Sequence, residues 1–68
     1  MKDYIVKYTS LLKNRTVVTL NDRIDLENNA HCVAIVNGKE HKYELTHNEF
    51  MVVFPETINL MIGDTIRI

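Results

Sequence analysis

Four residues of this chain could bind a metal ion through nitrogen or sulfur: His31, Cys32, His41 and His47. A structural zinc ion usually takes four such ligands, with cysteines or histidines arranged in two closely spaced pairs. The three histidines and the single cysteine show no such pattern. The sequence therefore predicts no metal and no other cofactor, and it favours partly exposed histidines in strands and turns.

The side chains that could act as nucleophiles or as acids and bases are equally isolated. Ser10 is the only serine, and no Gly-x-Ser-x-Gly turn surrounds it. Cys32 lies in an apolar run, where a thiol usually serves as a small core side chain. Glu40 and Glu44 flank a lysine on a face predicted to be wet, and both glycines stand alone, so no phosphate-binding loop is present. We expect no catalytic residues and no enzymatic activity.

Charge is distributed unevenly, although the formal net charge is only −1. Residues 1–23 carry a balance of +3 and residues 24–68 a balance of −4. Small barrels bind single-stranded nucleic acid with cations and aromatic rings on one face. The candidate residues for binding RNA or single-stranded DNA are Lys7, Tyr8, Lys13 and Arg15. The alternative, which the absence of a basic stripe favours, is a mixed surface with Tyr4 and Tyr8 in the core.

The segments that would position these side chains are predicted to be β-strands. β-Branched and aromatic residues are dense, and turn residues interrupt them at short intervals, which is typical of small barrels and sandwiches. The expected strands are 4–8, 16–20, 30–36, 39–45, 50–54 and 65–68. We predict one all-β domain over residues 1–68, a five- to six-stranded antiparallel barrel or sandwich of SH3-like or OB-like size, with at most one short helical turn.

Alternation within these strands predicts which side chains are buried. Tyr4, Val6 and Tyr8 would share one face of the first strand, and residues 11–14 would connect it to the second. Strand 16–20 has apolar residues on both faces, which predicts a central position or cover on both sides. In strand 39–45, we expect these side chains to point inward: His41, Tyr43 and Leu45. Those between them, Glu40, Lys42 and Glu44, would face water.

The strongest turn signal is Asn37-Gly38, because both residues tolerate the positive φ that tight hairpins need. A two-residue turn would place Cys32 and Ala34 on the inner face. A three-residue turn with a glycine bulge would bury the odd-numbered residues between 31 and 35 instead. The bulged register buries larger side chains, and we therefore expect it.

Two segments and one strand partner have alternative interpretations. Residues 21–29 either continue as a strand or form a helical turn capped by Asn21. Residues 46–49 match a capping box that could begin a short helix, but a turn into strand 50–54 is favoured by Val52 and Val53. The last strand must pair with the first strand or with another chain.

One local resemblance concerns the nine residues Leu60 to Ile68. The sequence Leu-Met-Ile-Gly-Asp followed by Thr-Ile-Arg-Ile is similar to a segment of the carbon-storage regulator family, which are small dimeric RNA-binding β proteins. In that family the segment lies near the start of the chain, and a basic strand that contacts RNA accompanies it. That strand has no counterpart in this sequence, and we transfer no functional residue from the family.

The composition suggests that the protein acts by binding a partner and not by catalysing a reaction. Hydrophobic residues make up 46% of a 68-residue chain, and a chain this short cannot bury them all. A lone cysteine and apolar runs of at most five residues predict a cytoplasmic protein without a membrane segment or signal peptide. Abundant Ile, Asn and Lys indicate an AT-rich gene, as in many phages. We expect a phage or mobile-element protein that binds and modulates a host protein, forms a homodimer, or does both.

Overall fold

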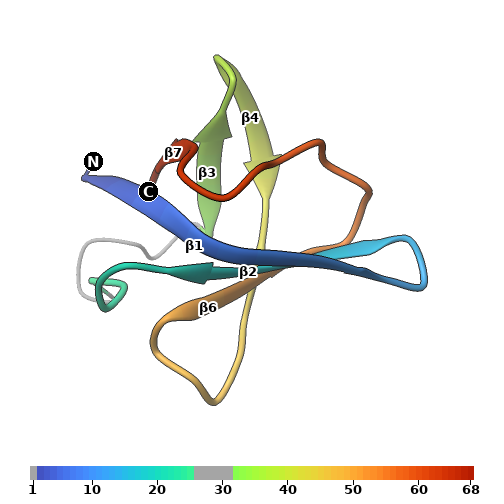
Figure 1. The fold of residues 1–68 in the computed structure, drawn as a ribbon, viewed down its shortest axis with the longest axis horizontal. Coiled ribbons are helices and arrows are strands. Elements are labelled where there is room, and N and C mark those ends of the chain that lie inside the picture. The colour runs from blue at the N-terminus through green and yellow to red at the C-terminus, as the bar shows by residue number, and fades with distance from the viewer. Residues whose placement is uncertain (1, 26–31) are drawn as a thin grey trace.

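The computed structural model describes residues 2–25 and 32–68, which form one strongly curled antiparallel sheet (Figure 1). These residues contain seven strands and no helix. The strands are β1 (Asp3–Leu12), β2 (Arg15–Leu20), β3 (Val33–Val36), β4 (Lys39–Lys42), β5 (Glu44–Leu45), β6 (Met51–Phe54) and β7 (Thr65–Arg67). The prediction of a small all-β antiparallel fold is confirmed.

The structure has seven strands, rather than the expected five or six, because one predicted strand is divided into two. Along the sheet the order is β4-β3-β7-β1-β2-β6-β5. The predicted strand 39–45 divides at Tyr43, so that its first part pairs with β3 and its second part with β6. The Tyr43 N–H donates a hydrogen bond to the Cys32 carbonyl at 2.9 Å, at the point of division. One chain segment therefore supplies both end strands of the sheet.

The core fills the inside of the curled sheet. Strands β2, β3 and β6 bury alternate side chains, as expected for strands with one face on a core. The largest fully buried side chains are Tyr4, Phe54, Leu20, Ile66 and Ile68. As predicted, β2 lies inside the sheet, between β1 and β6.

The first hairpin is longer than predicted. We expected residues 11–14 to connect two strands, but β1 continues to Leu12, which pairs with Arg15. The turn consists only of Lys13 and Asn14, with φ of 50° and 65°. Two consecutive residues at positive φ form the mirror-image turn that matches the twist of the strands. Asparagine suits this turn, whereas lysine gives no sequence signal for it.

A bulge in β1 overturns the predicted position of Tyr8. Val6 pairs with Leu20 and Tyr8 pairs with Thr19, so Lys7 is an extra residue between them. Such an insertion moves every following side chain to the opposite face. Tyr4 and Val6 are fully buried as predicted, but Tyr8 is 68% exposed.

The hairpin at Asn37 and Gly38 has the two-residue turn, and the predicted bulged register is wrong. Val36 pairs with Lys39, and the turn residues have φ of 51° and 80°. Ala34 and Val36 are therefore buried, while the larger odd-numbered side chains of β3 are only half buried. The twist-matched turn determined the register, and the volume of the side chains did not.

The remaining alternatives are resolved where the structure describes the chain. Residues 51–54 form β6, as favoured, after a turn in which the Asn48 side chain accepts a hydrogen bond from the Phe50 N–H. β7 pairs with β1, so the last strand finds its partner within the chain. Residues 21–25 form neither strand nor helix, and 26–29 lie outside the described residues. Leu45, predicted to point inward, is 45% exposed because β5 is a short end strand.

Tyr43 leads to a stability prediction, because its buried hydroxyl has no hydrogen-bond partner among the described residues. Replacing it in Tyr43→Phe should raise the free energy of unfolding by about 1 kcal/mol, since an unsatisfied buried hydroxyl is costly. Burial also raises the pKa of Tyr43 from 10.0 to about 12. The unfolded chain thus loses this proton first, and stability falls as the pH rises from 10 to 12.

Urea unfolding of wild type, Tyr43→Phe and Tyr8→Phe near pH 8 and pH 11 tests both effects. The advantage of Tyr43→Phe should grow with pH, and Tyr8→Phe, altered at an exposed ring, should behave as wild type. A Tyr43→Phe variant that is less stable than wild type at both pH values would contradict the prediction.

Candidate functional site

The residues with the most reactive side chains are dispersed. Within residues 2–25 and 32–68, no group of three or more His, Cys, Asp or Glu residues could hold a metal ion. His41 contacts the Glu56 carboxylate and places its ring edge-on to Phe54, at 6.2 Å between centroids. His47 is exposed in the turn before β6, and Cys32 packs half-buried against the core. The fourth candidate ligand, His31, lies outside the described residues.

Most basic side chains of the N-terminal segment are paired with carboxylates. The ion pairs of the described residues are Lys2–Asp22, Arg15–Glu44, Arg23–Glu49, Arg67–Asp3 and the His41–Glu56 contact. Arg15 and Arg23 thus reach acids of the C-terminal segment, which mixes the two unlike charge regions. Pairs this exposed contribute little to stability because water and salt screen them, but they neutralise the local field.

Lys2 and Asp22 show this pairing most clearly. Lys2 Nζ lies 2.7 Å from Asp22 Oδ2 and 5.2 Å from the centre of the Tyr4 ring. The hydrogen bond to Asp22 raises the pKa of Lys2, and the same bond lowers the pKa of Asp22. Both groups therefore keep their charges at neutral pH, and Lys2 contributes little to binding an anion.

Two lysines of the predicted nucleic-acid set have no carboxylate within ion-pair distance in the described part of the chain. Lys7 forms the bulge of β1, and Lys13 begins the turn between β1 and β2. Tyr8 follows Lys7 on the outer face, and Arg15 is held by Glu44 at 3.7 Å. The structure brings all four predicted residues onto the β1–β2 hairpin, with Lys7 and Tyr8 at the bulge and Lys13 and Arg15 at the turn.

The most unusual surface feature is a group of exposed apolar side chains on that hairpin. We call residues 8–12 of β1 the β1 arm. Its large side chains are exposed by 68% (Tyr8), 63% (Leu11) and 61% (Leu12). Met61 and Ile62, each 67% exposed, belong to the turn whose Gly63 N–H donates to the Val6 carbonyl. Five large apolar side chains therefore stand in water along and beside one strand.

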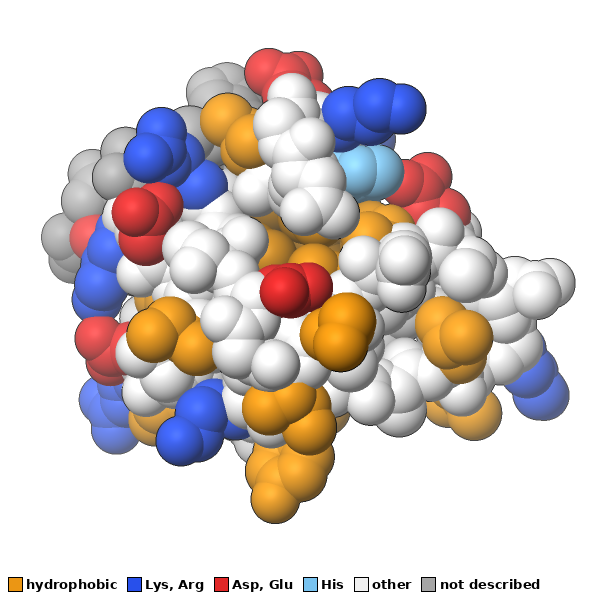
Figure 2. Space-filling model, turned by 45° about the horizontal axis from the view of Figure 1, so that its top comes forward, with side chains coloured by type: hydrophobic (Ala, Val, Ile, Leu, Met, Phe, Trp, Pro, Cys, Tyr) orange, Lys and Arg blue, Asp and Glu red, His pale blue; other side chains and the backbone are white. Residues whose placement is uncertain are grey.

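Tyr8 and Leu12, which lie opposite Thr19 and Arg15, extend an outer sheet face that is itself partly apolar. Tyr8 lies opposite Thr19, which lies opposite Met51 on the next strand. Val17 and Val53 form the following pair on this face, and all four residues of β2 and β6 are half-buried. Figure 2, which shows one face of the molecule, displays protruding hydrophobic side chains and a hollow with a hydrophobic floor.

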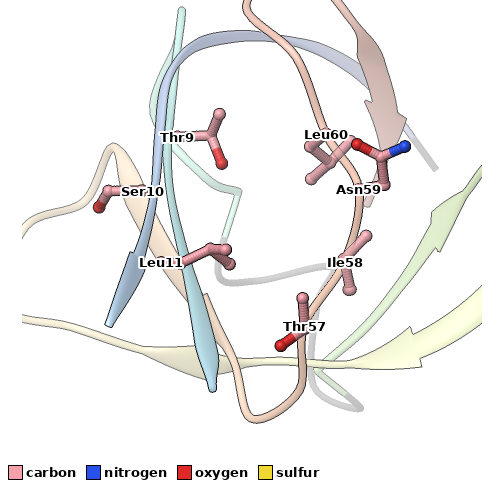
Figure 3. Close-up of a pocket in the computed structure, with 7 residues that line it drawn as sticks. All are labelled: Thr9, Ser10, Leu11, Thr57, Ile58, Asn59 and Leu60. Atoms are coloured by element: carbon pink, nitrogen blue, oxygen red, sulfur yellow. The ribbon is translucent and has the colours of Figure 1, made fainter. Parts of the chain in front are cut away.

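On its inner side, the β1 arm borders a cleft of about 450 Å³. One wall consists of residues 9–11 of β1, and the other is the extended segment 57–60 (Figure 3). Figure 3 shows Leu11 and Thr9 directed toward Ile58 and Leu60 across the cleft, while Ser10 points away. No residue in either wall is charged. A smaller hollow of about 290 Å³ lies beside the same segment and includes His41.

Thr16 holds this opposite wall in place. Its side chain is fully buried, and it is the only buried one of the described residues that is neither aliphatic nor aromatic. The hydroxyl donates a hydrogen bond to the Glu56 carbonyl and accepts one from the Ile58 N–H, both at 2.8 Å. The segment after β6 pairs with no strand, and one side chain of β2 supplies two of its backbone hydrogen bonds. Sequence reasoning found neither Thr16 nor segment 57–60, because these contacts span about 40 residues.

Thr16→Val tests this role, because valine has nearly the same shape and lacks the hydroxyl. Leaving the Ile58 N–H and the Glu56 carbonyl without partners should lower the free energy of unfolding by about 2 to 3 kcal/mol. Thr19→Val, on the outer face of the same strand, should change it by less than about 0.5 kcal/mol. Thermal and urea unfolding measure both, and equal stabilities of the two variants would refute the role of Thr16.

Comparison with known proteins identifies no relative: no family model matches the sequence, and no curated protein or solved structure matches significantly. The described residues contain no helix long and apolar enough to cross a membrane. The features of the described residues that bear on function are therefore the β1 arm, the cleft beside it, and Lys7 and Lys13 near its two ends.

Proposed function

We propose that this chain is a non-enzymatic protein-binding module whose contact surface is the β1 arm. The observation that carries this proposal is the exposure of Tyr8, Leu11 and Leu12, each above 60%, within five consecutive residues. Exposed apolar side chains in one continuous group are typical of interaction surfaces. Aromatic and large apolar residues also contribute most of the binding energy at protein interfaces.

The position of the arm supports this proposal. Within the described chain, the only strand that pairs with residues 8–12 is β2, so one edge and the outer face of the arm stay open to a partner. The neighbouring turn adds Met61 and Ile62 to the same region. Ser10 is the one candidate nucleophile within residues 8–12, and its side chain points away from the cleft. No histidine, cysteine or carboxylate of residues 8–12 lies beside it to act as a base, so the surface suits binding better than catalysis.

The composition suggests the kind of partner. Abundant Ile, Asn and Lys indicate an AT-rich gene, and together with the small size this supports a phage or mobile-element protein that binds and modulates a host protein. A second copy of the chain, forming a homodimer, would use the same exposed side chains. Sedimentation at several protein concentrations measures the oligomeric state, and it thereby distinguishes a homodimer from a monomer that binds a host protein.

Binding of a host protein can be tested directly by capture from a bacterial lysate. Tyr8→Ser combined with Leu12→Ser should reduce capture of the principal partner at least tenfold, because each truncated apolar contact costs about 1 kcal/mol or more. Leu45→Ser is the matched control, since Leu45 is an exposed leucine on β5, away from the arm. Quantitative mass spectrometry of the captured proteins gives the comparison. Unchanged capture by the arm variant, with folding verified, would refute the proposal.

Binding of RNA or single-stranded DNA is the second candidate function, and the exposure of Tyr8 beside Lys7 favours it. Its ring is available for stacking, contrary to the expectation of a core tyrosine. This hypothesis predicts a steep salt dependence of binding, weakened by Lys7→Ala together with Arg15→Ala. Fluorescence anisotropy with a labelled single-stranded oligonucleotide measures it. A flat titration at low ionic strength would exclude this function.

A further inference from the structure

The β1 arm has one edge without a strand partner in the described structure. β7 pairs with β1 only at residues 3–5, and the following turn bonds to Val6. From residue 8 to residue 12, β1 pairs with β2 on one side alone. A strand edge of this kind presents backbone N–H and C=O groups to whatever comes near it.

The register shows which backbone groups these are. The Leu20 N–H donates to the Phe50 carbonyl, so the even-numbered residues of β2 face β6 and the odd-numbered ones face β1. Ser10 lies opposite an odd-numbered residue of β2, and its backbone groups are used in that pairing. The N–H and C=O groups of Thr9 and Leu11 therefore point to the open edge, which is the side of the cleft.

The cleft beside this edge has the size and lining for one extended segment. Its volume of about 450 Å³ holds a few residues of extended chain. Leu11, Ile58 and Leu60 offer apolar surface, and the lining contains no charge that would need a partner (Figure 3). Because segment 57–60 forms the opposite wall, the space suits a single strand.

Charge at the two ends of the arm adds a requirement for the occupant. Lys7 precedes the open edge and Lys13 follows it, and neither has a carboxylate within ion-pair distance among the described residues. Six residue steps separate them, from the bulge to the turn, which is at most about 20 Å at roughly 3.4 Å per residue of strand. A matching segment would have acidic residues about this far apart, with uncharged residues between them.

We propose that the edge of the β1 arm binds an extended segment of a partner protein as an added strand. Aliphatic side chains of that segment pack on Leu11, Ile58 and Leu60, and acidic residues on either side meet Lys7 and Lys13. Main-chain hydrogen bonds to Thr9 and Leu11 supply affinity, and the cleft and the lysines supply specificity. This inference rests on the proposed protein-binding function and specifies how the binding occurs.

A displayed library of random dodecapeptides, selected on the immobilised full-length protein at low ionic strength, is the probe. The enriched peptides should share two acidic residues that flank an alternating aliphatic stretch without proline. Their affinity should fall at least tenfold for Lys7→Glu combined with Lys13→Glu, and should fall with added salt. Absence of an enriched family, or a family without acidic flanks, would overturn the proposal.

Amide hydrogen exchange tests the added strand without any substitution. In the free protein, the amides of Thr9 and Leu11 should exchange much faster than those of Ser10 and Leu12. Saturation with an enriched peptide should slow exchange at Thr9 and Leu11 at least tenfold. Binding without this protection would overturn strand addition, as would protection that depends on protein concentration alone.

Leu11→Pro removes the outward N–H while leaving the pairing of β1 with β2 intact, since proline is tolerated where the N–H faces away from the ladder. It should weaken peptide binding at least tenfold, whereas Leu11→Thr, which keeps the N–H, should weaken it less. If Tyr8→Ser with Leu12→Ser loses the lysate partner but Leu11→Pro keeps it, protein binding stands and strand addition fails. If neither variant affects capture, both proposals fail.

Discussion

One buried hydroxyl holds a wall of the cleft beside the β1 arm in place. Thr16 Oγ1 exchanges two hydrogen bonds with the backbone of Glu56 and Ile58, and thereby fixes a segment that joins no strand. That segment forms the far wall of the 450 Å³ cleft and one side of the smaller hollow near His41. Without it, the cleft beside β1 would lose a wall, and the exposed arm would be a simple open edge.

The charges of the molecule act chiefly by cancelling one another. The basic N-terminal segment and the acidic remainder meet in exposed pairs such as Arg15–Glu44 and Arg23–Glu49. These pairs contribute little stability individually, yet they remove the uneven charge that the sequence displays. Near the arm, the positive charges without a carboxylate partner among the described residues are those of Lys7 and Lys13, on either side of an uncharged cleft. A uniform polyanion gains little from such an arrangement, and a segment with spaced carboxylates gains more.

The sequence allowed the fold class, the central position of β2, the strand at 51–54 and the site of the second hairpin to be predicted, because each follows from local composition. Register was not predictable in the same way. The choice at Asn37 and Gly38 depended on turn geometry that competes with side-chain volume, and the volume argument was wrong. The bulge at Lys7 has no sequence signature, and it alone moved Tyr8 from the core to the surface. The cleft depends on contacts between Thr16 and a distant loop, which no local pattern encodes.

Tyr43 joins the two end strands of the sheet, β4 and β5, as successive parts of one segment. Strands at the ends of an ordinary sheet can detach separately, and each then exposes its neighbour to water. In this molecule, detaching either end strand pulls on the other through a single residue whose ring lies in the core. Partial loosening from an edge is thereby discouraged, and the domain should lose its structure in one cooperative step rather than strand by strand.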